Sequence, residues 1–161
     1  MSRPISIIMG SSSDLDTVQS AVDLLKEFKI AFDVKILSAH RTPKELAKYV
    51  EAVSAKGTKV FIAAAGGSAA LAGVIAAHTT LPVIGIPIET RSLKGLDSLL
   101  STAQMPAGIP VASMAIGKAG AKNAAIFALE ILGTSDKKIS NKLLKYKINM
   151  RLKVKKTKVK L

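Results

Sequence analysis

The hydrophobic positions of this chain form short apolar runs that alternate with stretches of helical spacing. Five runs are rich in Ile, Val and Ala and have the length of buried strands: residues 5–9, 30–37, 60–65, 82–86 and 110–115. Between these runs apolar residues recur every three or four positions, as on one face of a helix, in residues 15–25, 43–55, 96–103 and 117–133. Strands that alternate with helices form a parallel sheet covered on both faces. We therefore predict an α/β fold, a three-layer α/β/α sandwich with a flavodoxin-like five-stranded parallel sheet.

The loops that follow the first three strands contain the side chains of most chemical interest. Ser11 follows the first strand, His40 the second and Gly66 the third. Ligands of open parallel sheets bind outside the carboxyl ends of the strands. We therefore expect these three loops to converge on one crevice.

The second of these loops places three functional groups side by side. Ser38 offers a hydroxyl group, His40 an imidazole for proton transfer, and Arg41 a cationic fork that suits a phosphate or a carboxylate. Thr42 and Glu45 have the spacing of a capping box, and a proline occupies the first helical position between them. This pattern predicts a fixed helix start and a rigid loop in front of it.

The first loop, from Gly10 to Asp14, is rich in serine and leads from a strand into a helix. Backbone N–H groups and the positive end of a helix dipole favour a phosphate in such a loop. The loop lacks the Gly-Lys-Ser/Thr ending of a Walker A motif. The loop at Gly66 and Gly67 lacks the Gly-x-Gly-x-x-Gly fingerprint, which disfavours nicotinamide cofactors.

Composition narrows the class of protein. The 161 residues include no cysteine and only two histidines, which lie far apart, so we expect no disulfide and no metal site. No apolar run reaches the roughly 18 residues that a membrane span needs, and the first residues lack the pattern of a signal peptide. We expect a cytoplasmic protein without membrane contact.

The formal net charge of +13 is concentrated at one end of the chain. Residues 1–136 contain 13 Lys and Arg against 11 Asp and Glu, whereas residues 137–161 contain 11 basic residues and no acidic one. We expect a basic C-terminal helix to about residue 150, followed by a frayed and solvated tail at residues 154–161. Binding of RNA or anionic lipid is the alternative, but a solvated tail is favoured, so no nucleic-acid partner is expected.

Several motifs together resemble the PurE family of purine biosynthesis, the phosphoribosylaminoimidazole carboxylases, over residues 1 to about 135. The motifs are Met9-Gly10-Ser11-Ser12-Ser13-Asp14, Ser38 to Pro43, Ala65-Gly66-Gly67, Leu96-Asp97-Ser98-Leu99, Gln104-Met105-Pro106, Ile116-Gly117-Lys118-Ala119-Gly120 and Asn123-Ala124-Ala125. The resemblance implies that residues 1–136 form a PurE-like catalytic domain and that residues 137–161 add a helix and a tail. It also implies a homo-octamer in which the C-terminal helix packs on a neighbouring subunit.

The resemblance further implies the reaction of the family's mutase branch. That reaction moves a carboxylate of a ribonucleotide from an exocyclic nitrogen to the adjacent ring carbon, giving 4-carboxy-5-aminoimidazole ribonucleotide without a cofactor. His40 is the expected general acid and base. The expected substrate-binding residues are Ser11, Asp14, Ser38, Arg41, Gly66 and Gly67.

Two alternatives stay open, and the first arises because the sequence departs from the mutase pattern. The branch usually has Ala-His-Leu-Pro-Gly after the double glycine, whereas Ala70 and Ala72 stand here in place of the His and the Pro. The direct carboxylases, which use free CO₂, also lack that histidine, so a CO₂-dependent aminoimidazole ribonucleotide carboxylase is one alternative. A non-catalytic nucleotide- or phosphate-binding module is the other, since a fold does not decide a function.

Overall fold

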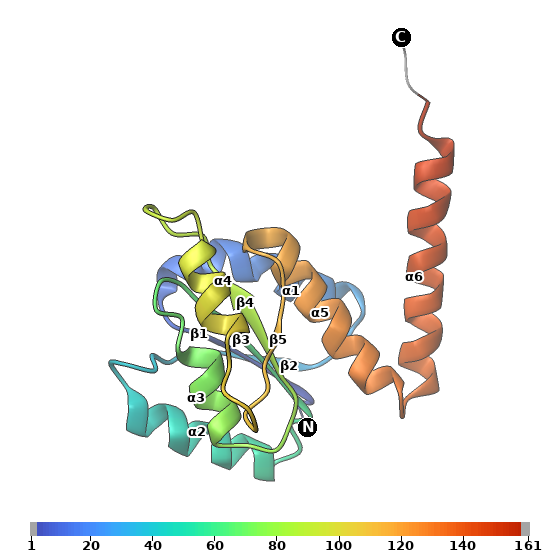
Figure 1. Ribbon diagram of the computed structural model, residues 1–161. Helices are drawn as coiled ribbons and strands as arrows, with labels where there is room; N and C mark the ends of the chain where they lie inside the picture. Colours follow the sequence, from blue (N-terminus) through green and yellow to red (C-terminus); the bar gives the residue numbers. More distant parts are fainter. Residues whose placement is uncertain (1–2, 159–161) are drawn as a thin grey trace. The chain divides into compact units, whose positions relative to one another are not determined.

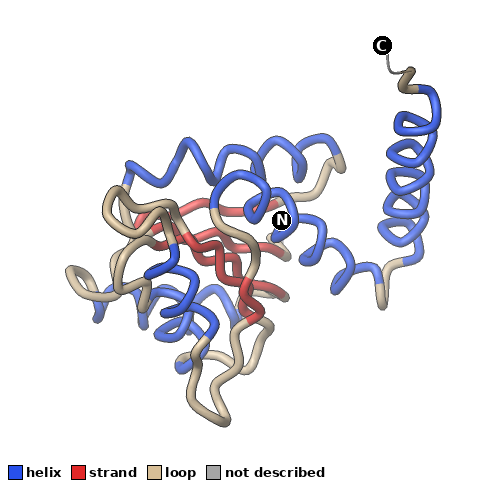
Figure 2. The backbone as a smooth tube through the Cα atoms, turned by 45° about the horizontal axis from the view of Figure 1, so that its top comes forward, coloured by secondary structure: helices blue, strands red, loops and turns tan. Residues whose placement is uncertain are grey.

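The computed structural model of this chain describes residues 3–158. Its sheet has helices on both faces (Figures 1 and 2). The strands are β1 (Ile5–Met9), β2 (Phe32–Ile36), β3 (Val60–Ala65), β4 (Val83–Pro87) and β5 (Ala112–Ser113). Their order is β2-β1-β3-β4-β5, and every pairing is parallel. This is the order of flavodoxin-like sheets, so the predicted fold is confirmed.

The helices follow the strands in alternation. They are the short 3₁₀ helix η1 (Ser12–Asp14) and the α-helices α1 (Leu15–Glu27), α2 (Pro43–Ala55), α3 (Leu71–Ala77), α4 (Leu96–Ala103), α5 (Gly117–Gly133) and α6 (Lys137–Lys156). The described residues divide into two compact units, with the boundary between Ala128 and Leu129 inside α5. The division predicted after residue 136 stays a prediction.

The core lies on both faces of the sheet. Ile8 of β1 packs with Leu46 of α2 and Ile75 of α3. Because side chains alternate along a strand, Ile5 and Ile7 point to the opposite face, and both are fully buried as well. Such two-sided burial explains why the strands read as continuous apolar runs.

Most predicted boundaries hold, and the exceptions have local causes. The second strand is shorter than predicted because the N–H of Ile30 donates to Leu25 O over 3.1 Å and so closes the end of α1. The fifth strand has only two residues; it is an edge strand, and Pro110 has no N–H to donate. Leu15, expected on the inner face of α1, is 46% exposed because it begins the helix.

The C-terminal helix is longer than predicted, since α6 continues to Lys156 rather than to about residue 150. Asp136 caps its start by accepting hydrogen bonds from the N–H groups of Lys138 (2.8 Å) and Ile139 (3.3 Å). No Gly or Pro interrupts residues 137–156, so nothing in the sequence stops the helix earlier. Residues 154–158 are exposed, as expected, and residues 159–161 of the predicted tail lie outside the described residues.

Candidate active site

A cleft of about 510 Å³ opens where the loops after β1, β2, β3 and β4 meet. Its volume is typical of a site for a small molecule. Of the residues predicted to bind or act on a substrate, those that line the cleft are Ser11, Asp14, Ser38, His40, Arg41 and Gly66. Gly67 is not among the lining residues. The predicted convergence of three loops on one crevice is therefore confirmed.

The first loop is held by a capping box that Ser11 and Asp14 form. The N–H of Ser11 donates to Asp14 Oδ2 over 3.0 Å, and the hydroxyl of Ser13 donates to Ser11 Oγ over 2.9 Å. Asp14 is only 7% exposed. Burial raises the pKa of the Asp14 carboxyl above its usual range, although hydrogen bonds from Ser11 and Ser13 and the charge of Arg41 act in the other direction.

The second loop is held differently from the prediction. Thr42 precedes α2 but makes no side-chain cap for it, so the capping box expected with Glu45 is wrong. Instead, the Thr42 hydroxyl accepts a hydrogen bond from the N–H of Ser38 (2.8 Å) and donates to Ser38 O (3.1 Å). Both hydrogen bonds of the Thr42 hydroxyl therefore close the loop, and none is left to cap α2. The loop is held by these bonds rather than by the predicted capping box.

Arg41 joins this loop to the first one. Its Nη2 donates to the carbonyl oxygen of Gly10 over 2.7 Å, and its Nε donates to Ser38 Oγ over 3.3 Å. The backbone N–H of Arg41 also donates to Ser38 Oγ, over 3.2 Å. The guanidinium is thus oriented while N–H groups on Nη1 are left for an anionic ligand.

His40 lines the same cleft and is exposed. Within residues 3–158, no group makes a hydrogen bond or an ion pair with its ring. Both ring nitrogens are thus open to a ligand. The second histidine, His78, ends α3, and its Nδ1 lies 3.5 Å from Glu51 Oε1. It does not line the cleft.

The third loop uses its two glycines in different ways. Gly66 lines the cleft, and nothing but hydrogen projects from its Cα. Gly67 has a φ of +67°, which disfavours residues with a side chain, and its N–H donates to Ser98 Oγ over 2.9 Å. Ser98 is completely buried and in turn donates to Ile88 O over 2.7 Å. The loop is thereby fixed to the loop after β4.

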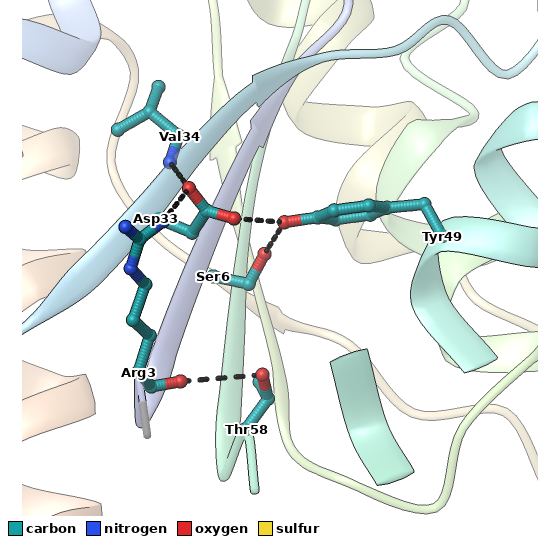
Figure 3. A network of polar contacts seen from close by, with 6 residues as sticks. All are labelled: Arg3, Ser6, Asp33, Val34, Tyr49 and Thr58. Carbon is teal, nitrogen blue, oxygen red and sulfur yellow. Dashed lines mark hydrogen bonds and ion pairs between the residues drawn. The ribbon is translucent and has the colours of Figure 1, made fainter. Parts of the chain in front are cut away.

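A polar network towards the amino ends of the strands fixes α2 (Figure 3). The hydroxyl of Tyr49 donates to Asp33 Oδ2 of β2 over 3.0 Å and lies 3.0 Å from Ser6 Oγ of β1. Asp33 also pairs with Arg3 over 2.8 Å. Burial raises the pKa of Tyr49, which keeps its hydroxyl protonated as a donor. These contacts join β2 to α2, the two elements that flank the second loop.

Sequence reasoning missed part of the lining. The remaining members are Gly10, Ser13, Ala39, Ala65, Ala69, Ala70, Leu71, Ile88 and Glu89. The strand-end rule, applied to the fourth predicted strand as it was to the first three, would have pointed to Glu89. The small Ala side chains give no such signal.

Among residues 3–158, no three His, Cys, Asp or Glu side chains gather where they could hold a metal ion, and no helix has the length and hydrophobicity of a membrane span.

Residues 4–153 match the sequence model of the family described as AIR carboxylase. The chain is 52% identical over 139 residues to the N5-carboxyaminoimidazole ribonucleotide mutase of Vibrio parahaemolyticus and 50% identical over 139 residues to that of Bacillus subtilis, covering 86% of this chain and of each relative. The relative of the same name from Saccharolobus solfataricus is 48% identical over 91% of this chain and 92% of its own. Among solved structures, Treponema denticola PurE matches with a TM-score of 0.85 and 30% identity, over 93% of this chain and 92% of that one.

Proposed function

This chain belongs to the AIR carboxylase family, and we propose that its cleft carries out the reaction of that family with His40 as general acid and base. The chain is an enzyme of purine biosynthesis, an isomerase that converts N5-carboxyaminoimidazole ribonucleotide to 4-carboxy-5-aminoimidazole ribonucleotide. Its relatives at about half identity favour this reaction over the direct carboxylase and over a non-catalytic binding module.

The observation that supports the proposed roles is the gathering of His40, Arg41 and the Ser11–Asp14 loop around one cleft. The substrate is a phosphorylated nucleotide, so it needs a cationic or N–H-rich end to its site. Arg41 provides the cation of that end, and the hydroxyl-bearing Ser11 of the first loop lines the same cleft beside it. Ser38 orients Arg41 because its hydroxyl oxygen accepts hydrogen bonds from the backbone N–H and the Nε of Arg41.

The proton transfers assigned to His40 follow from the two halves of the reaction. As the carboxylate leaves the exocyclic nitrogen as CO₂, the electron pair of the N–C bond stays on nitrogen, which takes a proton from His40. The ring carbon then attacks CO₂, and His40, now neutral, removes the proton that this carbon carried. The imidazole ends in its starting state, so the net reaction is an isomerisation and consumes no other reactant.

The CO₂ released in the first half must stay beside the ring carbon. Gly66 and the Ala side chains at positions 65, 69 and 70 make a small and apolar wall in the cleft. We assign the retention of CO₂ and of the carboxylate to this wall and to the backbone of Gly66, with Gly67 fixing the turn.

The proposal also covers the oligomeric state and the cellular location of the enzyme. We expect a homo-octamer, as the family resemblance implies, and we expect it to act in the cytoplasm, where purine nucleotides are made. The apolar side chains that α6 leaves exposed, Leu144, Ile148 and Leu152, support an association between subunits. A monomer in light scattering would contradict the octamer.

The deciding experiment is an assay of the purified protein with N5-carboxyaminoimidazole ribonucleotide and no added bicarbonate. We expect 4-carboxy-5-aminoimidazole ribonucleotide as the product. Product formed only from the decarboxylated ribonucleotide and CO₂ would instead identify a direct carboxylase. Binding of the ribonucleotide without any product would identify a binding module.

A further inference from the structure

Glu89 is a second carboxylate in the cleft, and its situation is opposite to that of Asp14. Asp14 is buried and accepts a hydrogen bond from Ser11 N–H. Glu89 is exposed in the cleft, and no side chain or backbone group of residues 3–158 pairs with its carboxylate. A charge without a protein partner in a substrate cleft is free to meet a group of the substrate.

The backbone on each side of Glu89 is fixed, although its side chain is not. Ile88 N–H donates to Ala65 O over 2.9 Å, and Ile88 O accepts from buried Ser98 over 2.7 Å. On the other side, the hydroxyl of Thr90 donates to Asp97 Oδ1 over 2.8 Å. Glu89 therefore projects from a rigid position, which is what a residue that meets a substrate needs.

Gly95 adds to this fixation. Its φ is +90°, and a Cβ atom on it would lie 2.6 Å from Ile116 Cγ2 and 3.2 Å from the Cα of Glu89. Only glycine fits such a position, so the loop packs directly onto the backbone of Glu89.

Glu89 also lies at the opposite end of the cleft from the cation. The Arg41 guanidinium is bonded to Gly10 after β1, whereas Glu89 follows β4, and the order β1-β3-β4 puts two strand spacings, roughly 10 Å, between these strand ends. A phosphate is attracted to the Arg41 end and repelled from the Glu89 end. The ribonucleotide is thus oriented with its phosphate near Arg41 and its aminoimidazole ring towards β3 and β4.

We propose that Glu89 accepts a hydrogen bond from the exocyclic N–H of the aminoimidazole ring and stabilises the positive charge that the ring gains when it attacks CO₂. This inference rests on the proposed function. In the attack, the ring carbon gives an electron pair to the carbon of CO₂, and a C=O electron pair moves to oxygen. The exocyclic nitrogen releases its lone pair into the ring and becomes positively charged until His40 removes the proton from the ring carbon.

An anion beside that nitrogen favours this charge distribution over the neutral ground state, which is how electrostatic stabilisation lowers a barrier. A carboxylate also suits the position because it only accepts hydrogen bonds, and the exocyclic nitrogen is a donor. Glu89 therefore acts on the rate of the carboxylation step more than on phosphate binding.

The first test compares kcat and KM of Glu89→Gln with wild type and with Glu27→Gln. Glu27 is an exposed glutamate at the end of α1, outside the cleft. Loss of a charged hydrogen bond in the transition state lowers kcat by about 10- to 100-fold in Glu89→Gln. KM stays within about threefold, because phosphate anchoring is unchanged. Glu27→Gln keeps wild-type values.

The second test needs no turnover. The affinity for 5-aminoimidazole ribonucleotide is compared with that for imidazole ribonucleotide, which lacks the exocyclic amine. Wild type binds the ribonucleotide with the amine about tenfold more tightly than the one without it. Glu89→Ala binds the two with about equal affinity, since the acceptor is gone. The preference is a ratio within one preparation, so a variant that is partly unfolded still reports it.

The outcomes separate the two levels of the argument. An inactive wild-type protein overturns the proposed function and this inference with it. An active wild type with unchanged kcat in Glu89→Gln, or with an undiminished amine preference in Glu89→Ala, overturns the role of Glu89 alone.

Discussion

Nη2 of Arg41 donates a 2.7 Å hydrogen bond to the carbonyl oxygen of Gly10, and this bond joins the loops that end β1 and β2. The two residues are 31 positions apart in sequence. The contact holds the guanidinium against the first loop, and Arg41 and Ser11 both line the same cleft. We propose that Arg41 and the first loop together form the phosphate site of the cleft.

Replacement of Arg41 tests this site. Arg41→Ala removes the charged donor and the link to Gly10, so we expect ribonucleotide binding to weaken by about 1.5 to 3 kcal/mol. Arg41→Lys should recover only part of the loss, because an ammonium group cannot donate to Gly10, Ser38 and a phosphate in the same fixed geometry. Calorimetric titration with the ribonucleotide measures both. Equal affinities for wild type and Arg41→Ala would place the phosphate elsewhere.

Replacement of His40 separates proton transfer from binding. His40→Asn keeps a polar side chain of similar reach but cannot accept and return a proton, so turnover should be abolished. Binding of the ribonucleotide should stay within about tenfold of wild type, since the imidazole is not assigned to anchoring. Product formation in a stopped assay and affinity in a titration are measured on the same preparation. A fully active His40→Asn enzyme would refute the assignment.

The burial of Asp14 gives stability a dependence on pH. Its carboxyl has a raised pKa in the folded chain, compared with an ordinary value of 3.8. Its contribution to stability is therefore fully present below about pH 3.8 and is lost as pH rises through the raised value. The free energy of unfolding of wild type, minus that of Asp14→Asn, should fall as pH increases from about 3.5 to 7.

Urea denaturation of both proteins at several pH values measures this difference. Glu27→Gln serves as the control, because Glu27 is exposed at the end of α1, and its difference from wild type should change little with pH. A difference for Asp14→Asn that rises with pH would mean that hydrogen bonds from Ser11 and Ser13 outweigh burial.

Truncation tests the basic tail. Deletion of residues 154–161 should leave turnover and oligomer size unchanged, because residues 154–158 are exposed and contain no acidic partner for their charges. Loss of either property would show that the segment docks. If the tail binds polyanions instead, full-length protein should hold RNA at low salt and release it steeply as salt rises, while the truncated protein does not bind.

The sequence by itself determined the fold class, the order of the elements and the position of the chemically important loops. Apolar runs of strand length and stretches of helical spacing are local signals, and they located β1, β3, α2, α4 and α5 at their observed bounds. The rule that ligands bind at the carboxyl ends of parallel strands then brought Ser11, His40 and Gly66 to one place. Motif resemblance further indicated the family, which the match over residues 4–153 confirms.

Only the tertiary structure decided which groups hold these loops and which remain free to act. Thr42 has the local spacing of a helix cap, yet its hydroxyl bonds to the backbone of Ser38, because the folded loop offers it nearer partners. Glu89 follows the end of a predicted strand, but nothing in the local sequence shows whether its carboxylate has a partner. Its place opposite Arg41 depends on strand order, and its lack of a partner depends on what the surrounding loops leave out. Such properties depend on distances between residues far apart in sequence, which no local pattern of residues contains.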